Sequence, residues 1–172
     1  SLGAEIDGQV LSFLNQSGDY AKQLFLQAAS GGQLEEQDAF IDRYGPISVE
    51  VLGIGMNGHL GFNEDGVDFS LRSHRTPLSA TTKSVQRKYF SGQDLPLTEG
   101  ITLGIAQIME SKTVIVIANG KKKAEIVAEA ILGPVTNRVP ASVLQEHPNC
   151  IYLLDDEAAS LLPADLPGLQ KI

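Results

Sequence analysis

The stretch that decides the fold is Val51-Leu-Gly-Ile-Gly-Met-Asn-Gly-His-Leu-Gly-Phe-Asn-Glu-Asp-Gly66. It begins within a short apolar run, Ile47–Ile54, that is rich in β-branched residues and therefore predicts a buried strand. Residues 53–66 then hold five glycines in fourteen positions, too many for a regular element. We therefore predict a strand followed by a long loop at its carboxyl end.

Two further apolar runs, Thr113–Ala118 and Cys150–Leu154, predict strands, and the first is expected to be central. Helical spacing of apolar residues and helix-ending glycines predict the intervening elements. These are helices over 20–29, 33–44 and 98–109, a helix that opens after Asn119–Gly120 and ends at Gly133–Pro134, a helical turn over 140–145, and a last short helix capped by Asp155 or Asp156. Strands that alternate with helices predict an α/β protein with a mainly parallel sheet and helices on both faces. Without repeats or interior linkers, residues 1–172 are predicted to form a single α/β domain.

Two of these helices carry more detailed expectations. Thr98 is expected to cap the first, whose apolar residues recur from Ile101 to Met109. The inner face of the helix between Asn119–Gly120 and Gly133–Pro134 is predicted to be formed by the residues Ala124, Val127, Ala128, Ile131 and Leu132.

Charge and composition exclude several classes of protein. The 172 residues include 21 acidic and 13 basic side chains, a net charge of −8, which disfavours binding to nucleic acid. The apolar runs are far shorter than the roughly 18 residues that span a bilayer, so no membrane partner is expected. The single cysteine, Cys150, cannot form an internal disulfide and is typical of a cytoplasmic protein. A homo-oligomer is compatible with the sequence.

Ligands of open α/β sheets bind beyond the carboxyl ends of the strands, where the glycine-rich loop is predicted to lie. Within it, His59 and Glu64 form a candidate proton-transfer pair, because histidine titrates near neutral pH, and Asn57 adds a neutral donor and acceptor. Gly55 and Gly58 would let the backbone approach a substrate closely. The alternative is that these polar groups only satisfy buried backbone.

A second loop, Asn119–Lys123, follows a predicted strand and opens a helix. Three lysines in a first helical turn oppose the helix dipole, unless an anion such as a phosphate lies on the exposed N–H groups. The alternative is a solvated basic face. No metal site is predicted, since His59, His74 and His147 lack the spacing of metal ligands.

The glycine-rich stretch 51–66, with its Gly-His-x-x-Phe-Asn-Glu core, closely resembles the signature of the glucosamine/galactosamine-6-phosphate isomerase (deaminase) family. The resemblance continues through Gly100–Gly104, Val114–Lys123 and Pro140–Pro148, and it covers about residues 47–157. The family implies a Rossmann-like three-layer α/β sandwich. It also implies conversion of an amino-sugar 6-phosphate to a ketose 6-phosphate and ammonia, with no metal or organic cofactor.

The resemblance implies roles for individual residues. His59 matches the residue that assists opening of the pyranose ring by handling the proton of the ring oxygen. Glu64 matches the carboxylate that orients or charges this imidazole. Lys123 matches a phosphate-binding lysine, and Lys88 falls where relatives often have a phosphate-binding arginine.

The chain also departs from the family pattern. Many glucosamine-6-phosphate deaminases have aspartate where this chain has Asn57; the Asn-Gly-His form resembles galactosamine-6-phosphate isomerases and favours that substrate. The family's N-terminal phosphate loop and its base for proton transfer between C1 and C2 are not found. We therefore expect that the chain lacks the family's N-terminal part, and that alone it is poorly soluble and has no deaminase activity.

Two other functions remain open at this point. The first is a sugar-phosphate lactonase related to the 6-phosphogluconolactonases, which share the Gly-His element but generally lack the Phe-Asn-Glu that follows it. The second is a non-catalytic sugar-phosphate-binding domain.

Overall fold

The structure is a computed structural model that describes residues 34–77, 99–168 and 170. It divides into two compact units, of which the larger, here called the sheet unit, contains residues 46–72 and 103 onward. The expected helix over 20–29, Lys88 and the proposed cap Thr98 lie outside the described residues.

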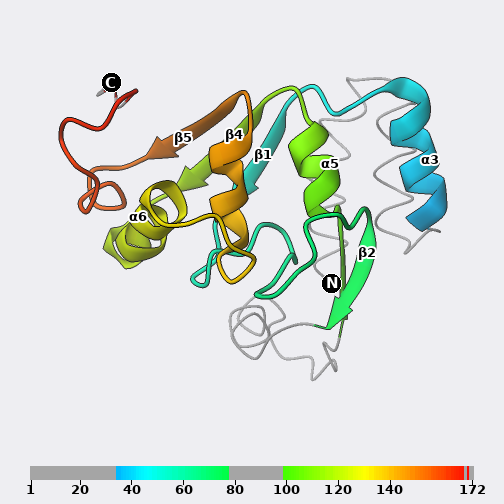
Figure 1. Cartoon of the computed structure of the whole chain (residues 1–172), viewed down its shortest axis with the longest axis horizontal. Coiled ribbons are helices and arrows are strands. Elements are labelled where there is room, and N and C mark those ends of the chain that lie inside the picture. The colour runs from blue at the N-terminus through cyan, green and yellow to red at the C-terminus, as the bar shows by residue number, and fades with distance from the viewer. Residues whose placement is uncertain (1–33, 78–98, 169, 171–172) are drawn as a thin grey trace, which may run out of the picture. The chain divides into compact units, whose positions relative to one another are not determined.

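The sheet unit is built on three parallel strands, β1 (Glu50–Gly53), β4 (Val114–Ala118) and β5 (Cys150–Leu154), in the order β1-β4-β5 (Figure 1). Each predicted apolar run forms a strand, and the central position of residues 113–118 is confirmed. β1 is shorter than predicted, because the paired ladder begins only at Glu50. The parallel sheet with its helices confirms a Rossmann-like α/β fold.

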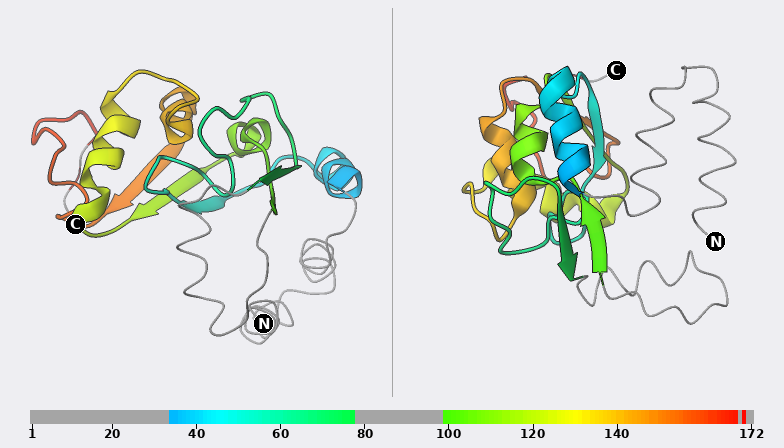
Figure 2. Two further views of the ribbon diagram at one scale, coloured as in Figure 1. Left: turned by 90° about the horizontal axis from the view of Figure 1, so that it is seen from below. Right: turned by 90° about the vertical axis from the view of Figure 1, so that its right-hand side faces the viewer.

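The helical elements of the sheet unit are α5 (Ile105–Glu110), η1 (Lys121–Lys123), α6 (Ala124–Leu132) and η2 (Pro140–Glu146). In Figure 2, α5, α6 and η2 lie along one face of the sheet. Val114, Val116 and Ala118 of β4 are buried in the core that they share with these helices. The predicted inner face of α6 is partly wrong: Leu132 is exposed, whereas Ile126 and Ala130 are buried.

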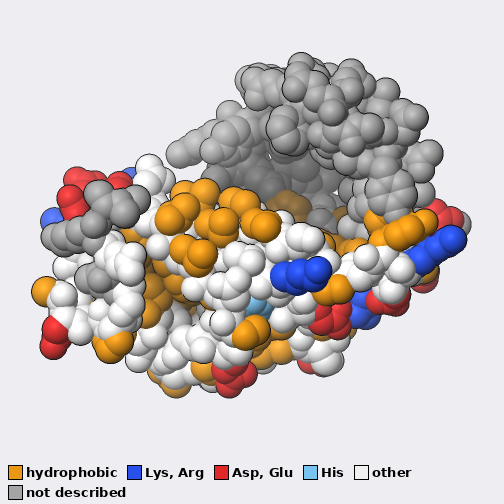
Figure 3. Space-filling model, turned by 90° about the horizontal axis from the view of Figure 1, so that it is seen from above, with side chains coloured by type: hydrophobic (Ala, Val, Ile, Leu, Met, Phe, Trp, Pro, Cys, Tyr) orange, Lys and Arg blue, Asp and Glu red, His pale blue; other side chains and the backbone are white. Residues whose placement is uncertain are grey.

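The opposite face of the sheet is apolar and exposed. In the parallel register Ile117 lies beside Gly53 and Leu153, and Ile151 lies beside Ile115. Four of the side chains on this face have exposed fractions of 44–59%: Val51, Ile117, Ile151 and Leu153. Figure 3 shows hydrophobic side chains gathered on the surface of the described residues. Helices were expected on both faces, and the elements described here cover one of them.

The predicted helix over 98–109 is only half correct. Residues Glu99–Thr102 form strand β3, which pairs antiparallel with β2 (His74–Pro77) in the second unit. Helix α5 begins at Ile105, after Gly104 in an extended conformation. A Cβ atom at Gly104 would lie 1.9 Å from the carbonyl oxygen of Leu71, so only glycine permits this close approach. The second unit also contains α3 (Leu34–Tyr44), as predicted, which ends at Gly45 with a φ of +95°.

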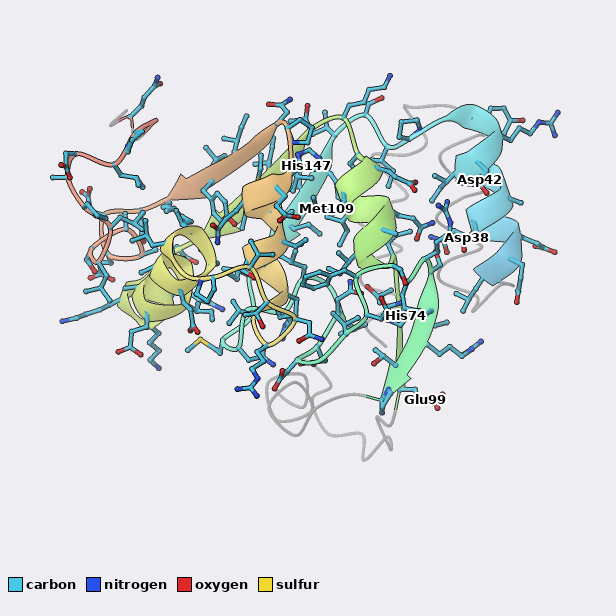
Figure 4. All side chains as sticks on the ribbon, viewed as in Figure 1. Asp38, Asp42, His74, Glu99, Met109 and His147 are labelled. Atoms are coloured by element: carbon cyan, nitrogen blue, oxygen red, sulfur yellow. The ribbon has the colours of Figure 1, made fainter. Side chains whose placement is uncertain are left out.

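A buried polar cluster lies at the amino end of the sheet, away from the glycine-rich loop. The Ser111 hydroxyl lies 2.9 Å from Glu50 Oε2 and 3.1 Å from the carbonyl oxygen of Gln107. His147, labelled in Figure 4 at the end of η2, hydrogen-bonds the Ser111 carbonyl oxygen at 2.8 Å. Burial raises the pKa of Glu50, opposed by the Ser111 hydrogen bond and the nearby His147. The Ser111 hydroxyl has a single proton, for which Glu50 and the Gln107 carbonyl oxygen are both acceptors, and its donation to Glu50 favours the ionised carboxylate.

This cluster predicts a pH dependence of stability. The pKa of the folded carboxyl lies above its ordinary value of 4.5, so folding takes up a proton, and stability increases as pH falls through the raised pKa. Glu50→Gln should flatten that part of the stability profile and raise the free energy of unfolding at pH 7 by about 1 kcal/mol. Urea unfolding of both proteins between pH 4.5 and 8 measures this; parallel profiles would contradict the assignment.

Candidate functional site

The glycine-rich loop folds back on itself directly after β1 and presents His59. The Gly55 N–H donates to the His59 carbonyl oxygen at 2.9 Å, and Ile54 forms an isolated antiparallel bridge with Leu60. A Cβ at Gly55 would lie 2.3 Å from the His59 ring, so the imidazole packs directly on this glycine. Gly58, with a φ of +79°, packs against Val139 and accepts a hydrogen bond from the Ala141 N–H at 2.8 Å. Both glycines therefore support the position of the imidazole, and their contact with a substrate stays a prediction.

Asn57 connects the two residues of the candidate proton-transfer pair. Its Oδ1 lies 2.7 Å from His59 Nδ1, and its Nδ2 donates to Glu64 Oε2 at 2.9 Å. His59 Nδ1 and Glu64 Oε2 are themselves 3.5 Å apart, and both side chains are largely buried. The structure thus brings His59, Glu64 and Asn57 together at the carboxyl end of β1, with the amide between the other two groups.

The contacts of Asn57 determine which nitrogen of the neutral His59 ring carries the proton. A carboxylate only accepts hydrogen bonds, so the amide NH₂ group must face Glu64 and the amide oxygen must face His59. His59 Nδ1 therefore carries the proton, and Nε2 of the neutral ring carries the lone pair. Burial lowers the pKa of His59, an effect that the Glu64 charge opposes and the Lys123 charge reinforces. The ring is accordingly a neutral base near neutral pH.

Asn57→Asp tests whether position 57 is coupled to the imidazole. A carboxylate 2.7 Å from His59 Nδ1 stabilises the charged ring, so the pKa of His59 should rise by on the order of one unit. NMR titration of the His59 ring protons measures this shift, and any pH–rate limb that depends on neutral His59 should move to higher pH. Asn57→Gln keeps the charge and serves as the control. An unchanged titration in Asn57→Asp would mean that position 57 does not influence His59.

Lys123 lies 69 residues after Ile54 in the sequence, and its side chain contacts the backbone next to the glycine-rich loop. It is the last residue of η1, and its ammonium donates to the carbonyl oxygen of Ile54, next to the glycine-rich loop. Burial lowers the pKa of Lys123, and its charge also acts on His59. Because an ammonium has three donors, two remain for a ligand after the Ile54 contact. Its neighbours Lys121 and Lys122 are exposed.

The N–H groups at the start of η1 do not form the open anion site that the sequence suggested. The Gly120 N–H donates to both carboxylate oxygens of Asp155, at 3.0 and 2.9 Å, and the Lys121 N–H donates to Glu157 Oε2 at 3.2 Å. These carboxylates occupy the positions that phosphate oxygens would take. Phosphate binding by Lys123 therefore depends on its side chain, and remains a prediction.

Sequence reasoning missed the structural roles of Asp155 and Asn63. Asp155 was predicted to cap a helix; it does accept the Ala158 N–H at 2.7 Å, but residues 155–162 form turns instead of a helix. Asn63 is fully buried, and its amide donates to the carbonyl oxygens of Leu60 and Leu103, 2.8 Å each. These contacts tie the loop to the start of α5. No local sequence pattern indicates this role, because the burial of Asn63 is decided by the tertiary fold.

Residues 34–77 and 99–168 contain neither a candidate metal site nor a candidate membrane-spanning helix. Within these ranges no group of three histidine, cysteine, aspartate or glutamate residues is arranged to hold a metal ion. No helix in them is long and apolar enough to cross a membrane.

Comparison with known proteins finds relatives that are named as sugar-phosphate enzymes. No protein-family model matches it. A glucosamine-6-phosphate deaminase of Streptococcus uberis is 46% identical over 117 residues, which are 68% of this chain and 50% of that protein. One from Listeria welshimeri is 39% identical over 150 residues, 83% of this chain and 64% of that protein. The chain thus spans about half to two thirds of the length of these curated relatives.

The solved structures agree. A monomeric glucosamine-6-phosphate deaminase, described as a missing link of the NagB superfamily, superposes with a TM-score of 0.71 and 37% identity, over 74% of this chain and 53% of that chain. A 6-phosphogluconolactonase from Leishmania guyanensis, at 22% identity and a TM-score of 0.53, covers 69% of this chain and 43% of that chain, and shares the fold alone.

The parallel sheet, the glycine-rich loop and the His59–Asn57–Glu64 set define a Rossmann-like α/β protein of the fold that these deaminases and lactonases share. Within that class, the chain belongs to the glucosamine/galactosamine-6-phosphate isomerase (deaminase) family.

Proposed function

We propose that this chain acts in an amino-sugar-6-phosphate isomerase/deaminase, where it opens the pyranose ring of the substrate and contributes Lys123 to phosphate binding. The observation that carries the proposal is the hydrogen-bonded connection of His59 through Asn57 to Glu64 at the carboxyl end of β1. The 46% identity to a glucosamine-6-phosphate deaminase supports the same activity. The proposal includes a reaction without metal or organic cofactor, as the resemblance implies, on a small-molecule substrate in the cytoplasm.

The chemistry of ring opening matches what this set of side chains can do. Opening a pyranose breaks the bond between C1 and the ring oxygen, removes the proton of the C1 hydroxyl and delivers a proton to the ring oxygen. Neutral His59 can accept the first proton at Nε2 and deliver it to the ring oxygen as an imidazolium. The charge of Glu64, 3.5 Å from Nδ1, stabilises that imidazolium. Lys88 would add a second charge for the phosphate.

Ring opening can be tested apart from ammonia release, which also needs a base that moves the proton between C1 and C2. Opening and reclosing the ring interconverts the α and β anomers, and exchange NMR on glucosamine 6-phosphate labelled with ¹³C at C1 measures that rate. The 172-residue chain should accelerate the interconversion. Ammonia release is followed in parallel. Binding without acceleration would favour the non-catalytic sugar-phosphate-binding domain, and absence of both would contradict the proposal.

The epimer is decided by the same assay. The names of the relatives support glucosamine 6-phosphate, and the Asn57-Gly-His form supports galactosamine 6-phosphate. We therefore expect the chain to accelerate anomer interconversion of both sugars and propose a comparison of the kcat/KM values for that step. The lactonase alternative rests on likeness of fold, and hydrolysis of 6-phosphogluconolactone by the chain would favour it over the deaminase.

A further inference from the structure

The carboxyl ends of β4 and β5 are joined by one carboxylate. Ala118 and Leu154 are paired at the end of the parallel ladder, and Gly120, two residues after Ala118, is hydrogen-bonded to Asp155, which directly follows Leu154. Asp155 accepts the Gly120 N–H with both oxygens and the Ala158 N–H with Oδ1. Glu157 adds a second connection of the same kind through the Lys121 N–H. Carboxylate contacts to backbone N–H groups are strong hydrogen bonds because the acceptor is charged.

The backbone held in this way leads directly to Lys123. Gly120 has a φ of +83°, which favours glycine, and its carbonyl oxygen accepts the Lys123 N–H at 3.0 Å. The turn from Gly120 to Lys123 therefore determines where the lysine side chain starts. From there the ammonium spans to the carbonyl oxygen of Ile54, 69 residues earlier in the sequence and next to the loop that carries His59.

We propose that Asp155 is a positioning residue that holds Lys123 at the carboxyl end of β1, through Gly120 and without touching the substrate itself. For its effect on binding, the inference rests on the proposed function. An exposed carboxylate near a phosphate site would weaken phosphate binding by repulsion if it acted through its charge alone. Removal of Asp155 is expected to have the opposite effect, because the loss of the Gly120 contact releases the turn that directs Lys123.

Calorimetric titration with glucosamine 6-phosphate tests the inference. Asp155→Ala should weaken binding about 10-fold, whereas Asp155→Asn, which keeps one acceptor oxygen, should fall between it and the wild type. Asp156→Ala removes the same charge from the next exposed residue and should bind like the wild type. In a Lys123→Ala background, Asp155→Ala should change affinity less than about twofold, because the two residues act as one unit. Losses that multiply in the double variant, or an unchanged affinity of Asp155→Ala, would overturn the inference.

A ligand-free measurement separates this inference from the proposed function. In Asp155→Ala the Lys123 ammonium should move into water, so its pKa, followed by NMR, should rise toward the ordinary lysine value; Asp156→Ala should leave it unchanged. If the wild type binds no sugar phosphate, the proposed function fails while this titration still decides the positioning role. Should Asp155→Ala not fold, the intermediate behaviour of Asp155→Asn decides it instead; a wild-type titration in that variant would overturn the inference.

Discussion

Replacement of His59 by alanine should slow anomer interconversion of the sugar phosphate, and any ammonia release, by a factor on the order of 10² to 10⁴. The reason is that alanine removes the base at Nε2 while the remaining contacts of the loop stay in place. The Gly55–His59 backbone hydrogen bond and the Ile54–Leu60 bridge do not involve the imidazole. Affinity for the sugar phosphate should therefore change less than about threefold.

The matched control for this variant is Met56→Ala, which removes an exposed side chain of the same loop. Exchange NMR gives the interconversion rate and calorimetry gives the affinity for each protein. A loss confined to binding, with an unchanged rate at saturation, would contradict the proton-transfer role of His59.

Lys123→Ala should weaken binding of an amino-sugar 6-phosphate by on the order of 10- to 100-fold, because it removes a charge-assisted contact with the phosphate. In the wild type the Lys123 ammonium is partly buried beside the loop and donates to the Ile54 carbonyl oxygen. The unphosphorylated amino sugar should lose nothing, since the contact is with the phosphate group.

Lys122→Ala provides a close control, because Lys122 is the adjacent exposed lysine and its removal changes the net charge equally. Calorimetric titration of both variants with glucosamine 6-phosphate and with glucosamine separates a specific contact from the general field of the basic segment. Equal losses for the two lysines, or equal losses for the two sugars, would rule out a specific phosphate contact of Lys123.

Much of the fold could be predicted from short-range patterns. The runs 113–118 and 150–154 form strands β4 and β5 at their predicted positions, because short continuous apolar runs are typical of strands in parallel sheets. The helix over 33–44 was predicted for a similar reason, and its end at Gly45 follows from the positive φ there. The exposed Leu132 of α6 shows the limit of the same reasoning, since periodicity alone does not determine which residues at the edge of a helix meet the core.

Strand β3 shows the competition between local and long-range preference. Residues 99–109 have helical spacing, yet Glu99–Thr102 pair with His74–Pro77, 22 to 28 residues earlier in the chain. The extended Gly104, packed against the Leu71 carbonyl, separates that strand from α5. A partner strand and a close backbone approach are set by the tertiary fold, so no window of local sequence contains them.

The sequence by itself determined the type of fold, and it predicted the loop and the candidate residues for the chemistry, because glycine density, apolar runs and side-chain chemistry are local properties. Only the tertiary structure decided how those residues act together. It places Asn57 between His59 and Glu64 and thereby determines which nitrogen of the imidazole carries the lone pair. It also brings the Lys123 ammonium to the Ile54 carbonyl oxygen. The N–H groups of Gly120 and Lys121 donate to the carboxylates of Asp155 and Glu157. The physical reason is that hydrogen bonds act over about 3 Å. The register of the parallel strands brings residues 35 to 69 positions apart to that distance, and this register is a property of the whole sheet.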